Sequence, residues 1–193
     1  MVNLNRIENI RDYYFLYLNS VCESVPIWFY VFLIGVMVFT MTLLFLIFGV
    51  KNVVKTFIII VLLEYLVFII CSAVFFRDLV EVRDYCLIPF WSYHASSEDL
   101  QNSLYIEKMM NVLMFVPIGF LMGGAFGHKI WKKVLVFAVS LSFLIETLQY
   151  MLKRGFSELD DVFHNTLGAM IGFGLIVGIL AVGKVLLNQH KKK

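Results

Sequence analysis

Residues 26–50 read PIWFYVFLIGVMVFTMTLLFLIFGV, a run of 25 residues without one charged side chain. A helix needs about 20 apolar residues to cross the roughly 30 Å of hydrocarbon in a bilayer. The run is too long for the core of a signal peptide, and no small-residue cleavage site follows it, so we expect it to be retained. It predicts a transmembrane helix.

The composition of the 193-residue chain agrees with this prediction. Hydrophobic residues make up 61% of the chain and charged residues 16%, and the mean hydropathy is +0.85. Soluble domains average about 45–50% apolar and 25% charged residues. The figures exclude a soluble domain, a disordered chain, a disulfide-rich scaffold and a repeat solenoid. The three cysteines lack metal-ligand spacing and no basic stripe is present, so we expect no metal, no cofactor and no nucleic acid.

Stretches long enough to span the membrane recur along the chain and predict an all-α integral membrane protein, a bundle of about five transmembrane helices. They are Pro26–Val50, Thr56–Phe76, Met109–Gly127, Val134–Leu152 and Val162–Gly183. Residues 1–25 mix charged side chains with tyrosines, which is typical of a segment lying in the membrane interface. The predicted division is an N-terminal interfacial segment (1–25), two helices (26–76), three helices (77–187) and a basic tail (188–193).

Lysines predict the orientation. With five spans, the loops 51–55 and 128–133 share one side with the C-terminal tail, and that side holds nine lysines and no acidic residue. The other side holds seven basic and twelve acidic residues. Because basic residues near span ends favour the cytoplasm, we expect the N-terminus outside and the C-terminus in the cytoplasm.

The fourth predicted span carries a polar stripe. Its members, which recur at i, i+4, i+7 and i+11 on one helical face, are Ser142, Glu146, Gln149 and Lys153. Such a stripe must face other helices or a wet cavity, so its carboxylate is a functional candidate. Hydrogen bonds that hold the bundle together explain the stripe equally well. For Glu64 in the second span we favour a structural role, paired within the bundle.

The segment 153–168 is the densest polar stretch of the chain. Ser157 followed by Asp160 resembles a capping box, which predicts Ser157 as the N-cap of the last helix. A second single-faced stripe follows, and its members are Asp161, Asn165, Gly168 and Gly172. Asp161 and Arg154 could form an ion pair or an anion-binding pair. His164 lies beside the stripe and is expected to be a packed or interfacial residue.

The third predicted span combines an amide, a proline and glycines. Asn111, Phe115 and Gly119 share one face. Pro117 frees a backbone carbonyl, which neighbours or water must satisfy. Gly168 and Gly172, and then Gly174 and Gly178 in the fifth span, form small-xxx-small pairs that permit close helix approach. Before the third span, Trp91 and Tyr93 are expected to anchor the loop in the interfacial aromatic belt.

Together these pieces resemble the VanZ-like (teicoplanin-resistance) family of bacterial membrane proteins. The match lies in their order and spacing over residues 87–172, and the first two spans add no recognisable family signature. The pattern is Leu87-Ile88-Pro89-Phe90, Asn111-x-x-x-Phe115-x-Pro117-x-Gly119, Ser142-x-x-x-Glu146-x-x-Gln149, Arg154 and Asp160-Asp161-x-x-x-Asn165-Thr166-x-Gly168. In one departure, Cys86 stands where many members have an asparagine.

The resemblance implies a multi-pass protein of the bacterial plasma membrane. It implies an association with low-level resistance to the lipoglycopeptide teicoplanin that does not depend on remodelling the D-Ala-D-Ala target. Our leading hypothesis is a non-enzymatic binding or membrane-organising role at the outer face, in which the stripes of the last three spans converge on one polar pocket. The expected partners are membrane lipids, a lipid-linked cell-wall precursor or the lipoglycopeptide itself.

The residues expected to line this pocket are Asn111, Glu146, Gln149, Arg154, Asp161 and Asn165. The residues expected to have structural roles are Pro89, Phe90, Pro117, Gly119, Gly168 and Gly172. An enzyme acting on a lipid-linked envelope substrate, with Glu146 or Asp161 as acid or base, is an alternative, although no nucleophile pair or phosphate loop accompanies it. A transporter is a third reading, which the lack of an internal repeat disfavours. The glycines also leave room for a homo-oligomer.

Overall fold

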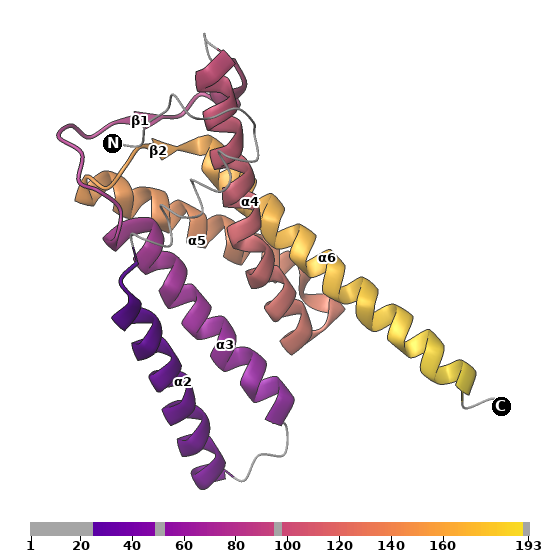
Figure 1. The fold of residues 1–193 in the computed structure, drawn as a ribbon. Coiled ribbons are helices and arrows are strands. Elements are labelled where there is room, and N and C mark those ends of the chain that lie inside the picture. The colour runs from indigo at the N-terminus through magenta and orange to yellow at the C-terminus, as the bar shows by residue number, and fades with distance from the viewer. Residues whose placement is uncertain (1–24, 49–52, 95–97, 191–193) are drawn as a thin grey trace.

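The computed structural model describes residues 25–48, 53–94 and 98–190. The expected interfacial segment, except Val25, and the last three residues of the basic tail lie outside this range. Long helices dominate the architecture (Figure 1): α2 (Ile27–Phe48), α3 (Val53–Ile70), α4 (Glu98–Phe126), α5 (Trp131–Leu152) and α6 (Leu159–His190). All five are long and apolar enough to cross a membrane, which confirms the predicted fold class. In hydrocarbon only a helix satisfies every backbone group within one segment.

Short elements connect the helices. A π-helical turn, η2 (Cys71–Phe75), extends α3, and 3-10 turns form η3 (Trp91–His94) before α4 and η4 (His128–Ile130) before α5. Two-residue strands, β1 (Tyr85–Cys86) and β2 (Ser157–Glu158), pair in parallel with Tyr85 opposite Ser157. This pair, which the sequence did not predict, joins the loop after α3 to the start of α6.

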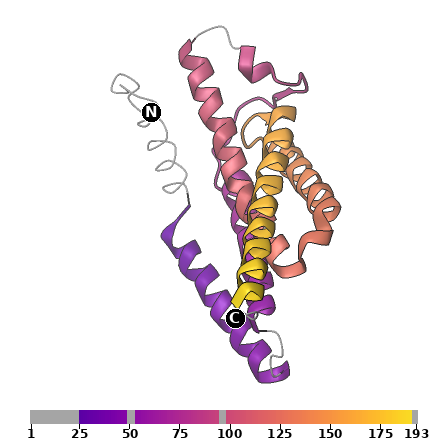
Figure 2. The ribbon, with the colours of Figure 1, turned by 90° about the vertical axis from the view of Figure 1, so that its right-hand side faces the viewer.

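Helices α4, α5 and α6 form the core of the bundle, and α2 and α3 form a hairpin beside it (Figures 1 and 2). The contact between α4 and α6 is the most extensive in the molecule. These two helices run in the same direction, because Gly168 meets Val112 while Gly172 meets Val116 one turn later. Helix α5 runs the opposite way and returns the chain to the end of the bundle at which α6 begins.

Glycines set the distance between α4 and α6. A Cβ atom on Gly172 would lie 1.9 Å from the carbonyl oxygen of Val116, and one on Gly168 would lie 2.0 Å from that of Val112. From the other helix, a Cβ on Gly119 would lie 1.7 Å from the carbonyl oxygen of Ala169. Real Cβ contacts are never this short, so the two backbones touch only because these positions lack side chains. The expected structural role of the three glycines is seen directly.

The second glycine pair behaves differently. Nothing lies within 4 Å of a Cβ placed on Gly174 or Gly178. These two residues lie on an open, apolar face of α6. Within the described part of the chain, therefore, only the first pair mediates helix packing.

Pro117 lies inside α4, as expected. Its ring nitrogen cannot donate to the Leu113 carbonyl one turn earlier. The next carbonyl, that of Met114, accepts a hydrogen bond of 2.8 Å from the Tyr65 hydroxyl of α3. This bond lies next to the interruption and ties the α2–α3 hairpin to the core.

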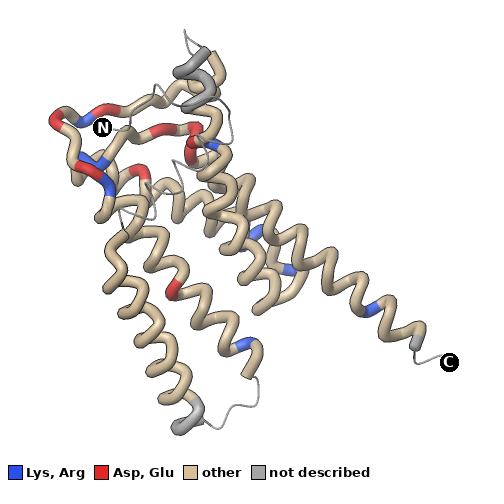
Figure 3. The backbone as a smooth tube through the Cα atoms, in the orientation of Figure 1, with Lys and Arg blue, Asp and Glu red and all other residues tan. Residues whose placement is uncertain are grey.

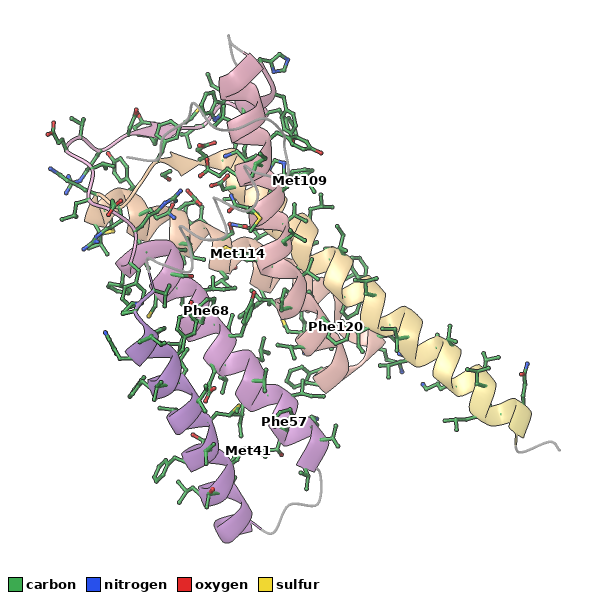
Figure 4. All side chains as sticks on the ribbon, in the orientation of Figure 1. Met41, Phe57, Phe68, Met109, Met114 and Phe120 are labelled. Carbon is green, nitrogen blue, oxygen red and sulfur yellow. The ribbon has the colours of Figure 1, made fainter. Side chains whose placement is uncertain are left out.

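Charged residues gather at one end of the bundle, around β1 and β2, while lysines mark the opposite ends of α3, α5 and α6 (Figure 3). The side chains show the same division, with nitrogen and oxygen atoms concentrated near β1 and β2 (Figure 4). We call the end that carries β1 and β2 the polar end. Loops 77–94 and 153–158 lie there together, as the five-span arrangement predicts.

Helix α4 begins at Glu98, 11 residues before the predicted apolar span at Met109, so it extends well beyond the purely apolar stretch. The start of α6 differs from the expectation. The predicted N-cap Ser157 is wrong, because Ser157 belongs to β2 and α6 begins at Leu159. The backbone N–H of Ser157 donates to the Asp84 carbonyl. The Asp160 carboxylate, the other half of the expected capping box, accepts a hydrogen bond from Ser92 instead.

Candidate functional site

A cavity of about 240 Å³ opens at the polar end between η2, α4, α5 and α6. Its lining is Ser72, Ala73, Phe76, Arg77, Asp78, Asn111, Met114, Phe115, Ile145, Glu146, Gln149, Asp161 and Asn165. Five of the six residues expected in a common pocket are among them. The structure therefore brings the polar faces of three helices together, as their spacing predicts.

The polar stripe of α5 is buried, and each of its members contacts a different element. The Asn165 amide donates to the Ser142 hydroxyl over 2.7 Å, and the Glu158 backbone N–H donates to Oε2 of Glu146 over 2.9 Å. The Gln149 amide donates to the Ala73 carbonyl in η2 over 3.0 Å. The stripe thus holds the bundle together and lines the cavity, so the two readings of it are compatible.

Lys108 is the residue that sequence reasoning missed. Its side chain is only 1% exposed, and its ammonium lies 2.5 Å from Oε2 of Glu158 and 2.6 Å from Oδ1 of Asp161. Because Lys108 directly precedes the predicted span, the sequence alone assigns it to the loop before that span. The feature that could have identified it is its position three residues before Asn111, which places both side chains on the same face of α4. Paired buried carboxylates need such a cation.

Arg154 is not where we expected it. It does not pair with Asp161 and does not line the cavity, and instead its Nη1 donates to the Arg77 backbone carbonyl over 2.5 Å. The guanidinium on the cavity wall belongs to Arg77, which also forms a 2.9 Å ion pair with Glu107 of α4. Lys153 likewise leaves its predicted stripe, because α5 ends at Leu152 and Lys153 turns outward with φ +57°.

Asp160 has a structural role. Its carboxylate is 2% exposed and accepts hydrogen bonds from the Phe90 N–H at 2.5 Å and from the Ser92 hydroxyl at 2.8 Å. Phe90 has φ +59°, an uncommon conformation for a bulky residue, and Asp160 holds it there. The Pro89-Phe90 segment is thereby fixed against the first turn of α6, while both residues remain exposed.

The aromatic residues after Phe90 direct their polar atoms into the protein, and their expected place in the interfacial belt stays a prediction. The Trp91 indole donates to Oε2 of Glu158 over 3.0 Å. The Tyr93 hydroxyl lies 2.7 Å from Nε2 of His164, whose Nδ1 lies 2.6 Å from the Asp160 carbonyl. Because a carbonyl only accepts, Nδ1 carries the proton and Nε2 accepts from Tyr93. His164 is thus a packed residue, as expected.

The ionisable groups next to the first turn of α6 are shifted by burial. Burial raises the pKa of the Glu158 carboxyl above its ordinary value, and Lys108 opposes this rise through its hydrogen bond and charge. Burial also raises the pKa of the Tyr93 hydroxyl, and the nearby Asp160 carboxylate adds to the effect. In both groups burial, which disfavours the charged form, is the largest cause of the shift.

Two acceptors in the cavity wall have no partner in the described part of the chain. They are Oε1 of Gln149 and Oδ1 of Asn165, on side chains that are 2% and 4% exposed. Leaving a buried polar atom unsatisfied costs about 1–3 kcal/mol. Such atoms call for water or a ligand that donates hydrogen bonds. Within the described ranges no group of three or more histidine, cysteine, aspartate or glutamate side chains is arranged to hold a metal.

Glu64 lies apart from this site. It lines an apolar cavity of about 330 Å³ between α2 and α3, together with Tyr30 and Phe68. The partner expected for it is not found, because its Oε1 is buried without a hydrogen bond among the described residues.

Comparisons with known proteins agree with the helical arrangement. A model of the VanZ/LLP1 family matches residues 28–181, from α2 to α6. Protein VanZ of Enterococcus faecium is 27% identical over 95 residues, which cover 47% of this chain and 59% of that protein. The matched region thus spans about three fifths of this relative. No solved structure matches the chain. Since the family model covers most of the chain, the protein belongs to the VanZ/LLP1 family.

Proposed function

We propose that this membrane protein binds the polar headgroup of a membrane lipid in the cavity at its polar end. The observation that carries the proposal is the pair of unsatisfied amide oxygens of Gln149 and Asn165 in the wall of a preformed cavity. Protein interiors rarely leave such atoms without partners, so donors from a ligand, or from water in its absence, are needed to satisfy them.

The size of the cavity favours a headgroup over a whole antibiotic. Sites for drug-sized ligands measure about 300–1,000 Å³. At about 240 Å³ the cavity is smaller than this range, so a lipoglycopeptide would not fit inside it. We therefore favour the lipid among the expected partners, with a lipid-linked precursor as the second choice when its headgroup is small.

The chemistry of the wall favours binding over catalysis. A nucleophilic mechanism needs a hydroxyl or thiol activated by an adjacent base. His164 is occupied on both ring nitrogens, by Tyr93 and by the Asp160 carbonyl. Glu146 and Asp161 each engage a structural partner through one carboxylate oxygen, the Glu158 N–H and Lys108 respectively. These contacts support the non-enzymatic reading.

In this proposal the cavity faces the outside of a bacterial plasma membrane, in line with the lysine distribution. By holding or arranging lipids at the outer surface, the protein would lower the access of a lipid-anchored drug to its target. Low-level resistance to teicoplanin, and not to a glycopeptide without a lipid tail, is the expected consequence.

A susceptibility test in a sensitive Gram-positive host examines this proposal. Wild type, Glu146→Gln, Asp161→Asn and the surface control Glu81→Gln are compared at matched membrane levels against teicoplanin and vancomycin. We expect wild type and the control to protect against teicoplanin alone, and both cavity variants to lose protection. Cavity variants that protect as well as wild type would contradict a role of the cavity. No protection from well-expressed wild type would contradict the link to the drug.

The orientation is tested separately. In a variant whose native cysteines are replaced by serine, single cysteines at position 81 or 129 report on the two ends of the bundle. We expect an impermeant thiol reagent to label intact cells through Glu81→Cys and not through Lys129→Cys. The reverse labelling would place the cavity in the cytoplasm and overturn the outer-face proposal.

A further inference from the structure

The hydrogen-bonding pattern of the cavity specifies the chemistry of its ligand. The Gln149 amide is oriented by its surroundings, because its nitrogen donates to the Ala73 carbonyl and only a donor can serve there. The atom of Gln149 that has no partner, Oε1, is therefore a hydrogen-bond acceptor. Glu146 uses Oε2 for the Glu158 N–H, which leaves Oε1 available among the described residues. The deep wall thus offers acceptors.

The charges in the deep part of the site point the same way. The buried charged groups here are one ammonium, that of Lys108, and the carboxylates of Glu146, Glu158, Asp160 and Asp161. Lys108 contacts Glu158 and Asp161, whereas Glu146 accepts a backbone N–H and has Arg77 as its nearest cation. Buried charges in such a site require compensation. A ligand that brings a cation to Glu146 would supply it, whereas an anion would add to the imbalance.

The mouth of the cavity has the opposite character. Arg77 lines the same cavity, and its side chain is 35% exposed, against 5% for Glu146. The cavity therefore has near its opening a guanidinium that is also paired with Glu107, and acceptors in its depth. A zwitterionic headgroup with a phosphate on the chain side and an ammonium at its tip matches this order, since guanidinium groups bind phosphate well.

We propose that the cavity selects a protonated primary amine, carried by an aminophospholipid headgroup, with its N–H groups on Gln149, Asn165 and Glu146 and its phosphate near Arg77. This inference rests on the proposed function and adds the class of headgroup. It requires N–H donors and not merely positive charge, because the orphan amide oxygens need hydrogen bonds. A quaternary ammonium, which has no N–H group, is expected to bind poorly.

Native mass spectrometry of the full chain, purified in detergent and mixed with defined lipids, tests the inference. Phosphatidylethanolamine, phosphatidylcholine and phosphatidylglycerol are supplied in equal amounts. The first two share a phosphate and a positive charge and differ in their N–H groups. We expect wild type to retain phosphatidylethanolamine about tenfold better than phosphatidylcholine, the effect of losing hydrogen bonds at a charged group.

Variants then connect the selectivity to the cavity. Gln149→Leu removes one orphan acceptor, and Glu146→Gln removes the charge while keeping an acceptor for the Glu158 N–H. Both should lower the preference for phosphatidylethanolamine, while Glu81→Gln, a surface carboxylate at the same end, keeps it. If Gln149→Leu does not fold, Glu146→Gln decides. A preference unchanged in Glu146→Gln would overturn the inference.

The outcomes separate the two proposals. Retention of no lipid at all would overturn the proposed function. Equal retention of phosphatidylethanolamine and phosphatidylcholine, or a preference for phosphatidylglycerol, would keep a lipid site and overturn the amine selectivity. A competition experiment distinguishes a lipid-bound amine from a free one. Displacement of phosphatidylethanolamine by methylammonium, but not by tetramethylammonium, supports a site that also accepts free amines. A preference that methylammonium does not reduce supports recognition of the intact lipid headgroup.

Discussion

The α2–α3 hairpin and the α4–α5–α6 core use opposite kinds of residue. Of the residues in Ile27–Leu44 of α2, which carry no charge, 6% are buried, against 44% in Leu104–Phe126 of α4. The buried helix is the one with an ammonium, an amide, a proline and glycines. In lipid, apolar side chains gain little by facing each other, and small and polar residues drive association. In this protein, hydrophobicity therefore marks the lipid-facing surface, and its interruptions mark the core.

The largest expected effect concerns the glycine contact between α4 and α6. Gly172→Leu would push a side chain into the Val116 backbone, which cannot move without separating the helices. We expect the variant to lose the folded state, seen as aggregation in detergent gel filtration and loss from the membrane. The matched control is Gly178→Leu, on the open face of α6, which should behave as wild type. Equal behaviour of the two variants would remove the contrast between the two glycine pairs.

Lys108→Met is expected to have the next largest effect. It leaves Glu158 and Asp161 buried without their cation, which in comparable cases lowers the free energy of unfolding by about 3–5 kcal/mol. Denaturation in mixed micelles measures this loss, and Lys184→Met on the exposed part of α6 is the control. Adding Asp161→Asn to Lys108→Met should restore part of the stability, because one uncompensated charge is then removed. An additive double variant would argue against direct coupling.

The pH dependence of Lys108→Met provides a sharper version of this test. Without Lys108, the charge and the hydrogen bond that oppose the effect of burial are lost, so the pKa of Glu158 should rise further above its ordinary value. A carboxyl with a higher pKa in the folded state binds its proton more tightly when folded. Its contribution to stability is present below the unfolded pKa of about 4.3 and is lost as the pH rises through the folded pKa. We therefore expect the stability deficit of Lys108→Met to shrink as the pH is lowered from 7 to 5.

The same substitution in the two regions tests the comparison itself. Ile118→Ala in α4 removes a side chain that is 0% exposed, and Ile34→Ala in α2 removes one that is 58% exposed. We expect Ile118→Ala to lower the free energy of unfolding by an amount near the lower end of about 2–5 kcal/mol, and Ile34→Ala by less than about 0.5 kcal/mol. Similar losses in thermal unfolding would show that α2 packs as tightly as the core.

The smallest expected effect concerns the link between the regions. Tyr65→Phe removes the hydroxyl that donates to the Met114 carbonyl, a contact worth about 0.5–1.5 kcal/mol. The loss should appear as faster hydrogen exchange around Pro117 and a small decrease in melting temperature. Tyr85→Phe, at an exposed position in β1, is the control. Unchanged exchange near Pro117 would mean that another group satisfies this carbonyl.

Much of the fold could be predicted because the membrane imposes few solutions. Uncharged runs fixed the number of helices, and 3.6-residue periodicity placed Glu146, Gln149 and Asn165 on converging faces. The glycine spacing indicated close contact, although it did not distinguish Gly172, which packs, from Gly178, which does not. That difference depends on which face of α6 meets α4, and no local pattern contains this information.

The site was less predictable where contacts between residues far apart in the sequence decide which side chains line the cavity. Arg154 and Arg77 are both in loops at the same end, and only the path of the chain after η2 puts Arg77 on the cavity wall. Lys108 lay one residue outside a predicted span, so its burial could not be inferred from hydropathy. Asp160 and Asp161 are adjacent in sequence and face different partners, the Phe90 loop and Lys108, because neighbouring helical residues point about 100° apart.

The length of α6 has a consequence for the depth of the cavity. Its 32 residues span about 48 Å, longer than the roughly 30 Å of hydrocarbon in a bilayer. Fitting all of it into that layer would require a tilt of about 50°, beyond the usual range of 0–40°. The stretch between Asp161 and Lys184, about 35 Å long, fits at a tilt of about 30°, within that range. With Lys184 at the opposite surface, the length of α6 would place Asp161 at the level of the lipid headgroups, where the headgroup of the proposed function would reach the cavity without leaving its own layer.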